Sequence, residues 1–212
     1  MLRFTKELID RIRLRPIRHF ESIEGWLTRK EALALYKLSR KCKPGARIVE
    51  IGSWKGKSTY CLAKGLRDGV IVAIDPFDGA GETGNPYDGL KGGSPLLDQF
   101  QANLRSYSLL EKIEIKVGPS SRFANEIHEI DMLFIDGDHS IAGCEYDFKT
   151  FAPEVKSGGI LAFHDYNPRR RELGPTWVVD NLVSKSAQWR LLGKWNSLIA
   201  FQRNPKDDSI DE

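Results

Sequence analysis

A short apolar strand that ends beside an acid and runs into a glycine turn is the feature that most constrains the fold of this chain. Residues 48–51 read Ile-Val-Glu-Ile, Gly52 follows, and a helical pattern begins after Gly56. An apolar strand that passes through a glycine turn into a helix is typical of a parallel sheet covered by helices. Such turns also serve merely to reverse the chain, so the motif alone leaves a purely structural role open.

The spacing of this turn indicates which kind of ligand it suits. The dinucleotide fingerprint needs Gly-x-Gly-x-x-Gly, and Trp54 stands where its second glycine would be. Without that glycine the backbone cannot close onto a pyrophosphate, which argues against a nicotinamide dehydrogenase. Glu50 beside Gly52 favours a ligand that carries a positive amine and no phosphate. S-adenosylmethionine is such a ligand.

A second apolar run supports a ligand site at the same edge of the sheet. Residues 70–75 are rich in β-branched side chains and end in Asp75, about 20 residues beyond the glycine turn. In a doubly wound fold an acid at this place can accept hydrogen bonds from both ribose hydroxyls. The alternative is that Asp75 caps the following loop.

Strand and helix patterns alternate along the rest of the chain. The alternation predicts an α/β fold with a doubly wound, mostly parallel, seven-stranded sheet of Rossmann-like type, preceded by N-terminal helices. A capping box at Thr28 and Glu31 predicts one of these helices over 29–42, stopped by Pro44-Gly45. The expected strands are 47–51, 70–75, 113–117, 131–136 and 159–164, with a closing hairpin at 189–194 and 197–202. The expected helices within the sheet domain are 57–66, 95–107, 121–128, 141–151 and 174–186.

A length of 212 residues suits one α/β domain with a sizeable core. We expect an N-terminal helical extension over 1–44, the cofactor-binding domain over 45–203 and a disordered acidic tail over 204–212. The glycine-rich polar segment 76–94 leaves the second strand beside the expected ligand crevice, which favours a substrate lid over a passive insert.

Charge and cysteine usage limit the partners and the compartment. A net charge of +3, without a basic stripe near the motifs, argues against nucleic acid. Three scattered cysteines fit a reduced, cytoplasmic compartment. Residues 2–15 alternate basic and apolar side chains in a pattern typical of an amphipathic helix. This helix would pack on a core edge or in a homodimer, or would bring residues 1–20 into peripheral contact with an anionic membrane.

Two further strand ends carry polar side chains. Asp136, Asp138 and His139 follow one expected strand, and His164 and Asp165 follow the next. Adjacent parallel strands bring such ends together, and a divalent cation would compensate the carboxylates and hold a substrate hydroxyl as an alkoxide. Either imidazole is also a candidate general base. The alternative is that these residues only form turns and caps.

Taken together, these segments resemble a class I S-adenosylmethionine-dependent methyltransferase. The likeness is closest to the cation-dependent O-methyltransferases of the macrocin (sugar) and catechol types, and residues 45–165 carry nearly all of it. The turn at 49–52, Asp75, the turn at 117–120 and the strand end at 135–139 occur in the order of that family.

The resemblance implies a role for each matched position. Glu50 and the backbone of Gly52 would hold the methionine end of the cofactor, Asp75 would bind the ribose, and the turn after residue 117 would line the adenine. The residues expected to bind the cofactor are Glu50, Gly52, Ser53, Trp54, Asp75, Pro76, Gly118, Ser120, Ser121 and Asp136.

The resemblance also implies a metal site and a substrate class. Asp136 would be the first ligand of Mg²⁺ or Mn²⁺, with His164 and Asp165 where relatives carry Asp-Asp or Asp-Asn. Imidazole shifts the preference from magnesium towards manganese, iron or zinc, or else no metal binds and His164 or His139 is simply the base. The implied reaction is methylation of a hydroxyl on a sugar, glycan or glycosylated metabolite. A small phenol or catechol as substrate, and a non-catalytic docking module, are the alternatives.

Overall fold

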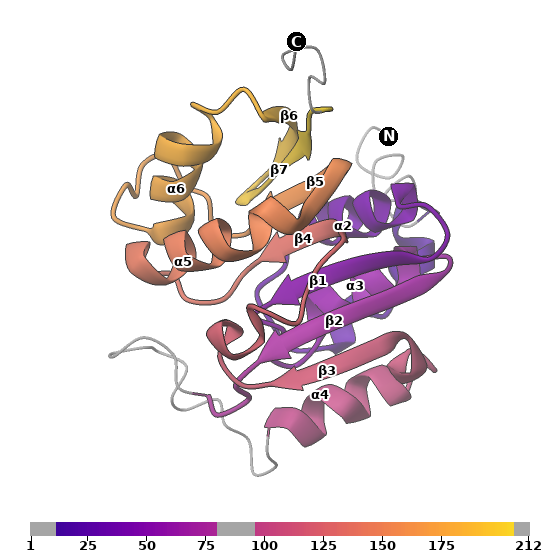
Figure 1. Cartoon of the computed structure of the whole chain (residues 1–212). Coiled ribbons are helices and arrows are strands. Elements are labelled where there is room, and N and C mark those ends of the chain that lie inside the picture. The colour runs from indigo at the N-terminus through magenta and orange to yellow at the C-terminus, as the bar shows by residue number, and fades with distance from the viewer. Residues whose placement is uncertain (1–11, 80–95, 206–212) are drawn as a thin grey trace.

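The computed structural model describes residues 12–79 and 96–205. Its centre is a seven-stranded sheet in the order β3-β2-β1-β4-β5-β7-β6 (Figure 1). Strands β1 to β5 pair in parallel, and β7 runs antiparallel to both β5 and β6. The expected doubly wound fold is therefore confirmed. The strands are β1 (Ala46–Ile51), β2 (Gly69–Asp75), β3 (Ile113–Val117), β4 (Ile130–Ile135), β5 (Val155–Phe163), β6 (Trp189–Trp195) and β7 (Leu198–Arg203).

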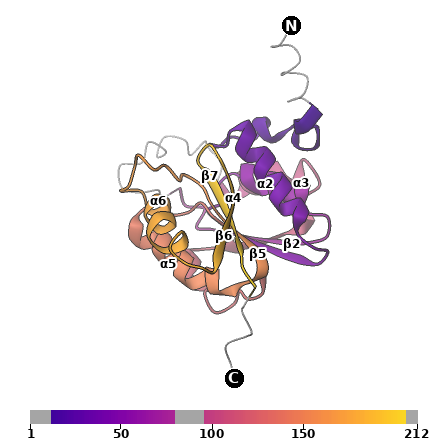
Figure 2. The same cartoon turned by 90° about the horizontal axis from the view of Figure 1, so that it is seen from above.

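Helices cover both faces of the sheet because successive side chains of each buried strand point to opposite sides. In β1, Ile48 packs in the core shared with α2, α3 and α4, whereas Val49 packs in the core shared with α5 and α6. Figure 2 shows α5 and α6 across the sheet from α2 and α3. The helices are α2 (Arg29–Lys41), α3 (Lys57–Gly65), α4 (Leu96–Arg105), α5 (Ile141–Phe151) and α6 (Gly174–Val178).

Two local expectations differ from the structure, and the expected end of α2 before Pro44-Gly45 is confirmed. The segment expected to be helical over 121–128 forms only a 3₁₀ turn, Ser120–Phe123, because it has no side-chain cap and buries only Phe123 and Ile127. The helix expected over 174–186 is α-helical to Val178 and continues as a π-helix over Val179–Val183. Helix α2 ends before Pro44-Gly45, because Cys42 is already extended.

The N-terminal segment shares the core of the sheet domain. Ile17, Phe20 and Ile23 are buried together with the apolar face of α2, against α3. Short 3₁₀ turns at Arg15–Ile17 and Phe20–Ser22 place these side chains. Residues 1–11 of the expected extension, 80–94 of the expected lid and 206–212 of the expected tail lie outside the described residues. In the part of the chain that is described, no helix is long and apolar enough to cross a membrane.

Gly52 lies where strand order reverses, between β1 and β4. Its φ is +87°, and a Cβ there would lie 2.1 Å from the carbonyl oxygen of Asp136. Its N–H donates to the carbonyl of Ile74 at 2.9 Å, and the Asp136 N–H donates to the carbonyl of Ile51 at 2.8 Å. Both the left-handed backbone and the close approach exclude any side chain. The turn after β1 is thereby held against the loop that follows β4.

We predict that Gly52→Ala destabilises the fold by about 3 kcal/mol or more, because the backbone at Asp136 must move. Gly45→Ala is the matched control: its φ is +77°, but a Cβ there would meet nothing within 4 Å. It should lose only about 1 kcal/mol, the cost of a left-handed residue with a side chain. Urea unfolding of both variants measures the difference. Equal losses would show that the close approach to Asp136 has no energetic weight.

Candidate active site at the carboxyl ends of strands β4 and β5

The polar residues after β4 and β5 lie at one edge of the sheet. Asp136 directly follows β4, His139 comes three residues later, and His164 and Asp165 directly follow β5. The His164 N–H donates to the carbonyl of Ile135 at 3.1 Å, so the sheet pairing continues just past the end of β5. This backbone bond helps to hold the residues at the carboxyl ends of β4 and β5. Ligands usually bind at this edge of the sheet in doubly wound folds.

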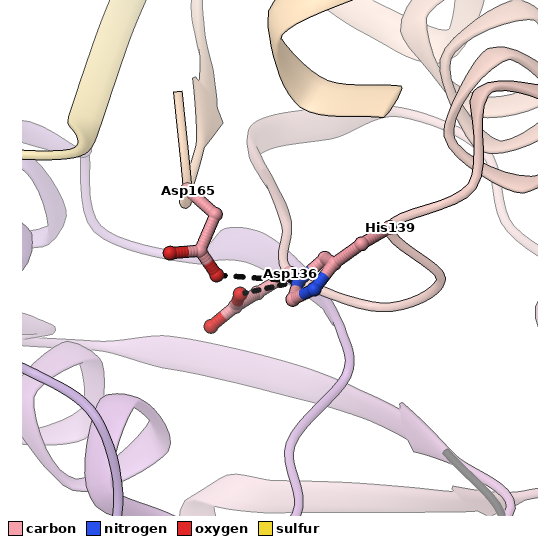
Figure 3. Close-up of side chains that lie close together, drawn as sticks. All are labelled: Asp136, His139 and Asp165. Carbon is pink, nitrogen blue, oxygen red and sulfur yellow. Dashed lines mark ion pairs between the residues drawn. The ribbon is translucent and has the colours of Figure 1, made fainter. Parts of the chain in front are cut away.

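Asp136, His139 and Asp165 come together at this edge (Figure 3). Nε2 of His139 lies 3.3 Å from Oδ2 of Asp165 and 3.7 Å from Oδ1 of Asp136. The ligand atoms of the three residues lie within 4.8 Å of one another, and all three side chains are partly exposed. Asp165 has a φ of +55°, an uncommon backbone for a residue with a side chain. One imidazole and two carboxylates at this spacing form a set that can hold a metal ion.

His164 lies behind these residues, and its side chain is only 4% exposed. Its Nδ1 is 3.2 Å from both Oδ1 of Asp136 and Oδ2 of Asp165, and its Nε2 is 3.7 Å from Oε2 of Glu31. Burial alone would lower the pKa of His164, but the three carboxylates hold that pKa well above its usual range. A buried imidazolium thus stands among three carboxylates.

Glu31 joins the site to two other parts of the fold, and sequence reasoning recognised it only as a helix cap. Its Oε2 accepts hydrogen bonds from the backbone N–H and the hydroxyl of Thr28 at 2.8 and 2.7 Å. Its Oε1 accepts from the N–H and the hydroxyl of Ser197, in the β6–β7 turn, at 2.9 and 2.7 Å. Burial raises the pKa of Glu31, but bonds with His164, Ser197 and Thr28 outweigh it and hold the pKa below the usual value.

The charges of this group do not cancel. Burial favours the neutral form of Asp136, yet the imidazoles of His164 and His139 lower its pKa below the ordinary value. Asp136, Asp165 and Glu31 share the single buried imidazolium of His164. The group therefore keeps an excess of negative charge on the side that His139 and Asp165 expose, which suits a cation.

Asp138 does not join this cluster, although the sequence places it between two members. Its side chain is exposed, and its Oδ1 accepts a hydrogen bond from the Ser140 N–H at 2.7 Å. Its other oxygen lies against Gly143 in the first turn of α5. Asp138 thus forms a turn just before α5, whose N-cap is Ser140, and this is the turn role that the sequence left open.

Asp75 holds the glycine turn in the ligand-free structure. Its Oδ2 accepts from the N–H groups of Ser53 and Trp54 at 2.9 and 2.8 Å, and its Oδ1 accepts from the Phe77 N–H at 2.6 Å. Burial raises the pKa of Asp75, and these three bonds oppose the shift. The exposed Pro76 lies between these contacts. Ribose binding by Asp75 and Pro76 stays a prediction.

Glu50 is fully buried at the base of the same turn. Its Oε2 accepts hydrogen bonds from the hydroxyls of Ser53 at 2.9 Å and Thr59 at 2.5 Å. Among the described residues its Oε1 has no hydrogen-bond partner. Burial raises the pKa of Glu50 to about 7. Sequence reasoning missed Thr59, which a hydroxyl in the first turn of the following helix could have indicated.

The turn after β3 carries the expected adenine residues. Gly118 has a φ of +145°, Ser121 is exposed, and the hydroxyl of Ser120 donates to Oδ1 of Asp147 at 2.5 Å. Asp147, on α5, is 3% exposed, and burial raises its pKa to about 6. Sequence reasoning missed Asp147, because an acid inside a helix gives no signal of burial.

This fold, with a glycine turn after β1 and acids after β2 and β4, defines a class I S-adenosylmethionine-dependent methyltransferase domain. Comparison with known families agrees: a model of methyltransferase domains matches residues 49–166, more than half of the chain. The chain belongs to that family. The resemblance seen in the sequence is therefore confirmed at the level of family and fold.

Individual relatives are distant. Protein R132 of Acanthamoeba polyphaga mimivirus is 29% identical over 128 residues, which cover 60% of this chain and 55% of R132. The match thus spans about half the length of that curated relative.

Solved structures of methyltransferases share the fold over almost the whole chain. The O-methyltransferase TomG of Streptomyces achromogenes, solved with S-adenosylmethionine, superposes with a TM-score of 0.64 at 16% identity, over 92% of this chain and 89% of TomG. The methyltransferase PaMTH1 of Podospora anserina, solved with S-adenosylhomocysteine, gives 0.64 at 16% identity, over 95% and 96%.

We predict that Glu50 makes the ligand-free protein less stable as the pH rises. Its pKa is raised from 4.5 to about 7, so the folded state binds a proton more tightly than the unfolded state. Stability is then lost between about pH 4.5 and 7, by about 3 kcal/mol. Glu50→Gln removes this titration. Urea unfolding at pH 5 and pH 8 should show the variant gaining about that much relative to the wild type; parallel curves would contradict the prediction.

Proposed function

We propose that this chain is an S-adenosylmethionine-dependent O-methyltransferase that acts on a hydroxyl of a sugar, glycan or glycosylated metabolite. The observation that carries the proposal is the cluster of Asp136, His139 and Asp165 beside the Gly52 turn. This arrangement puts groups able to activate a hydroxyl next to the edge where a doubly wound fold binds its cofactor. The family match supports methyl transfer, and the O-methyltransferase TomG supports oxygen as the acceptor.

The turn residues fit the cofactor that the resemblance implies. The buried Oε1 of Glu50 is an acceptor that the ammonium of the methionine end would satisfy. Oδ2 of Asp75 already accepts two N–H bonds, whereas Oδ1 accepts only the Phe77 N–H and retains a lone pair for a ribose hydroxyl. The bound S-adenosylmethionine of TomG and S-adenosylhomocysteine of PaMTH1 support this assignment by analogy of fold.

The proposed reaction is a direct displacement at the methyl carbon. The acceptor oxygen forms a bond to that carbon while the carbon–sulfur bond breaks, and the electron pair stays on sulfur to give neutral S-adenosylhomocysteine. The hydroxyl proton passes to a base of the site. The protein positions the two reactants in line, removes the proton and stabilises the negative charge on oxygen.

His139 is the proposed base. Its side chain is 29% exposed, and because its Nε2 is buried against Asp136 and Asp165, Nδ1 is the nitrogen that would take the proton. His164, by contrast, is buried behind the two acids. His164 is also held as an imidazolium by its carboxylate neighbours, so it has no free lone pair for a substrate proton. We assign His164 to charge compensation, and Asp136 to orientation of the His139 ring.

A divalent cation fits the same cluster. Asp136, Asp165 and His139 offer two oxygens and one nitrogen, and the negative excess of the group is what a cation would neutralise. Mixed nitrogen and oxygen donors favour Mn²⁺ over Mg²⁺. Such an ion would lower the pKa of a coordinated hydroxyl. His139 would then be a ligand rather than the base, and His164 would support the ligands from behind.

An aromatic pair beside the turn favours a sugar acceptor. The ring of Trp26, 52% exposed, lies 4.8 Å from that of Trp54, two residues after Gly52. An exposed indole face suits the apolar face of a pyranose. A small phenol or catechol would also stack there and is the second candidate; a docking module without catalysis is the third. A cytoplasmic location, a homodimer and peripheral membrane contact through residues 1–20 stay predictions.

The first test is calorimetric titration with S-adenosylmethionine, with EDTA and then with Mg²⁺ or Mn²⁺. We expect micromolar binding that survives EDTA, because the main cofactor residues, Glu50, Gly52 and Asp75, are not members of the metal-ligand group. A separate Mn²⁺ titration should give one site per chain that Asp165→Ala removes. Absence of cofactor binding in every condition would end the enzyme proposal and leave the docking module.

The second test separates the catalytic cluster from its neighbours. Asp136→Ala should lower turnover roughly a thousandfold, because it removes both the orienting group of His139 and a metal ligand. Asp138→Asn, two residues away, should keep turnover and lose at most about 1 kcal/mol of stability, because Asp138 only accepts the Ser140 N–H in the turn before α5, and an asparagine oxygen can do the same. Methyl transfer from radiolabelled cofactor to a panel of glycans and catechols measures both. Near-normal turnover in Asp136→Ala would contradict the assignment.

A further inference from the structure

A hollow lies along helix α3, apart from the cluster after β4 and β5. It has a volume of about 520 Å³ and contains none of the residues of the glycine turn or the cluster. Lys64 lies seven residues into α3, so the hollow reaches roughly 10 Å along that helix from the turn. The lining residues are Arg15, Pro16, Arg18, His19, Tyr60, Lys64 and Tyr107.

The lining carries positive charge without a carboxylate. Arg15, Arg18 and Lys64 all face the hollow, and none of the lining side chains is acidic. Within the described ranges these three cations make no ion pair, whereas neighbouring Arg29 pairs with Glu21 at 2.7 Å. The described part of the fold thus gathers three cations from two segments far apart in the sequence, and pairs none of them with a described carboxylate; Arg18 donates to Nε2 of His19 at 2.8 Å. Such an arrangement is stabilised by a bound anion.

The hollow has a fixed aromatic wall. Tyr60 is 1% exposed, and its ring meets the ring of Tyr107 edge-on at 5.0 Å. Tyr107 stacks on His19 at 5.2 Å, and its hydroxyl bonds that of Ser22 at 2.7 Å. Burial raises the pKa of Tyr60 to about 12, so its hydroxyl stays protonated. The three cations therefore lie beside aromatic rings that are held in place by packing and a hydrogen bond.

We propose that this hollow binds a phosphate group. Guanidinium groups match phosphate oxygens with paired hydrogen bonds, and the Lys64 ammonium adds a point charge. The volume exceeds what one phosphate needs, so the group would be part of a larger molecule. Two sources share this chemistry: a free phosphate-bearing metabolite and the headgroup of an anionic lipid. Arg13, an exposed residue two positions before Arg15, would favour either.

This site is independent of methyl transfer, so its test uses binding alone. The full-length protein is titrated with inorganic phosphate and pyrophosphate at constant ionic strength. It is then sedimented with vesicles of phosphatidylcholine, with and without phosphatidylglycerol. The variants are Arg15→Glu and Lys64→Glu, two exposed residues whose reversal leaves the core intact. Lys37→Glu, an exposed lysine on α2 outside the lining, is the matched control.

Two results would support the site. Saturable binding of pyrophosphate, weakened roughly tenfold by each reversal in the hollow and unchanged in Lys37→Glu, would identify a free phosphate ligand. Sedimentation only with phosphatidylglycerol vesicles, lost in the same two variants and kept in the control, would identify a lipid headgroup. Absence of both kinds of binding would overturn the proposal. Equal loss in all three variants would also overturn it, because binding would then depend on the overall charge of the protein and not on the hollow.

Discussion

Compensation of three carboxylates by one buried imidazolium is the interaction on which this edge of the sheet depends. His164 stands among Glu31, Asp136 and Asp165, and each of these acids comes from a different part of the chain. Removal of the central charge would leave the buried Glu31 and the partly exposed Asp136 and Asp165 without their shared counter-charge, which is unfavourable. The same contact draws helix α2 and, through Ser197, the β6–β7 turn onto the ends of β4 and β5. The contacts that hold the candidate site in place therefore also attach α2 and the β6–β7 turn to the sheet.

The glycine turn is held by side chains of the protein itself. Asp75 holds the backbone of Ser53 and Trp54, and Glu50 holds the hydroxyls of Ser53 and Thr59. These acids are the ones that the resemblance assigns to the cofactor. A turn that is already fixed loses little further freedom when a ligand binds, which is the general advantage of a preorganised site. Placing Glu50 in the core lowers stability when its carboxyl is ionised, because burial raises its pKa.

Much of the architecture could be predicted from the sequence, because the strands are buried on both faces and read as continuous apolar runs. The ends of β2 and β3 were correctly expected to within a residue. The segment after Pro119 could not be predicted, because its short apolar pattern fits a helix as well as a 3₁₀ turn. In the site, Asp136 and Asp165 were expected to lie together, and they do; Asp138 was expected beside them and instead forms the turn that precedes α5.

The sequence by itself determined the sheet, the glycine turn and the residue types at the strand ends, because apolar periodicity and glycine spacing are local signals. Only the tertiary structure decided which partners those residues have. Glu31 reads as an ordinary helix cap, yet packing of α2 brings it to His164, 133 positions along the chain. Packing also decided how the two histidines differ. Both follow strands, but only the side chain of His164 is buried. Burial and long-range charge pairing depend on how the elements meet, and no local pattern encodes that.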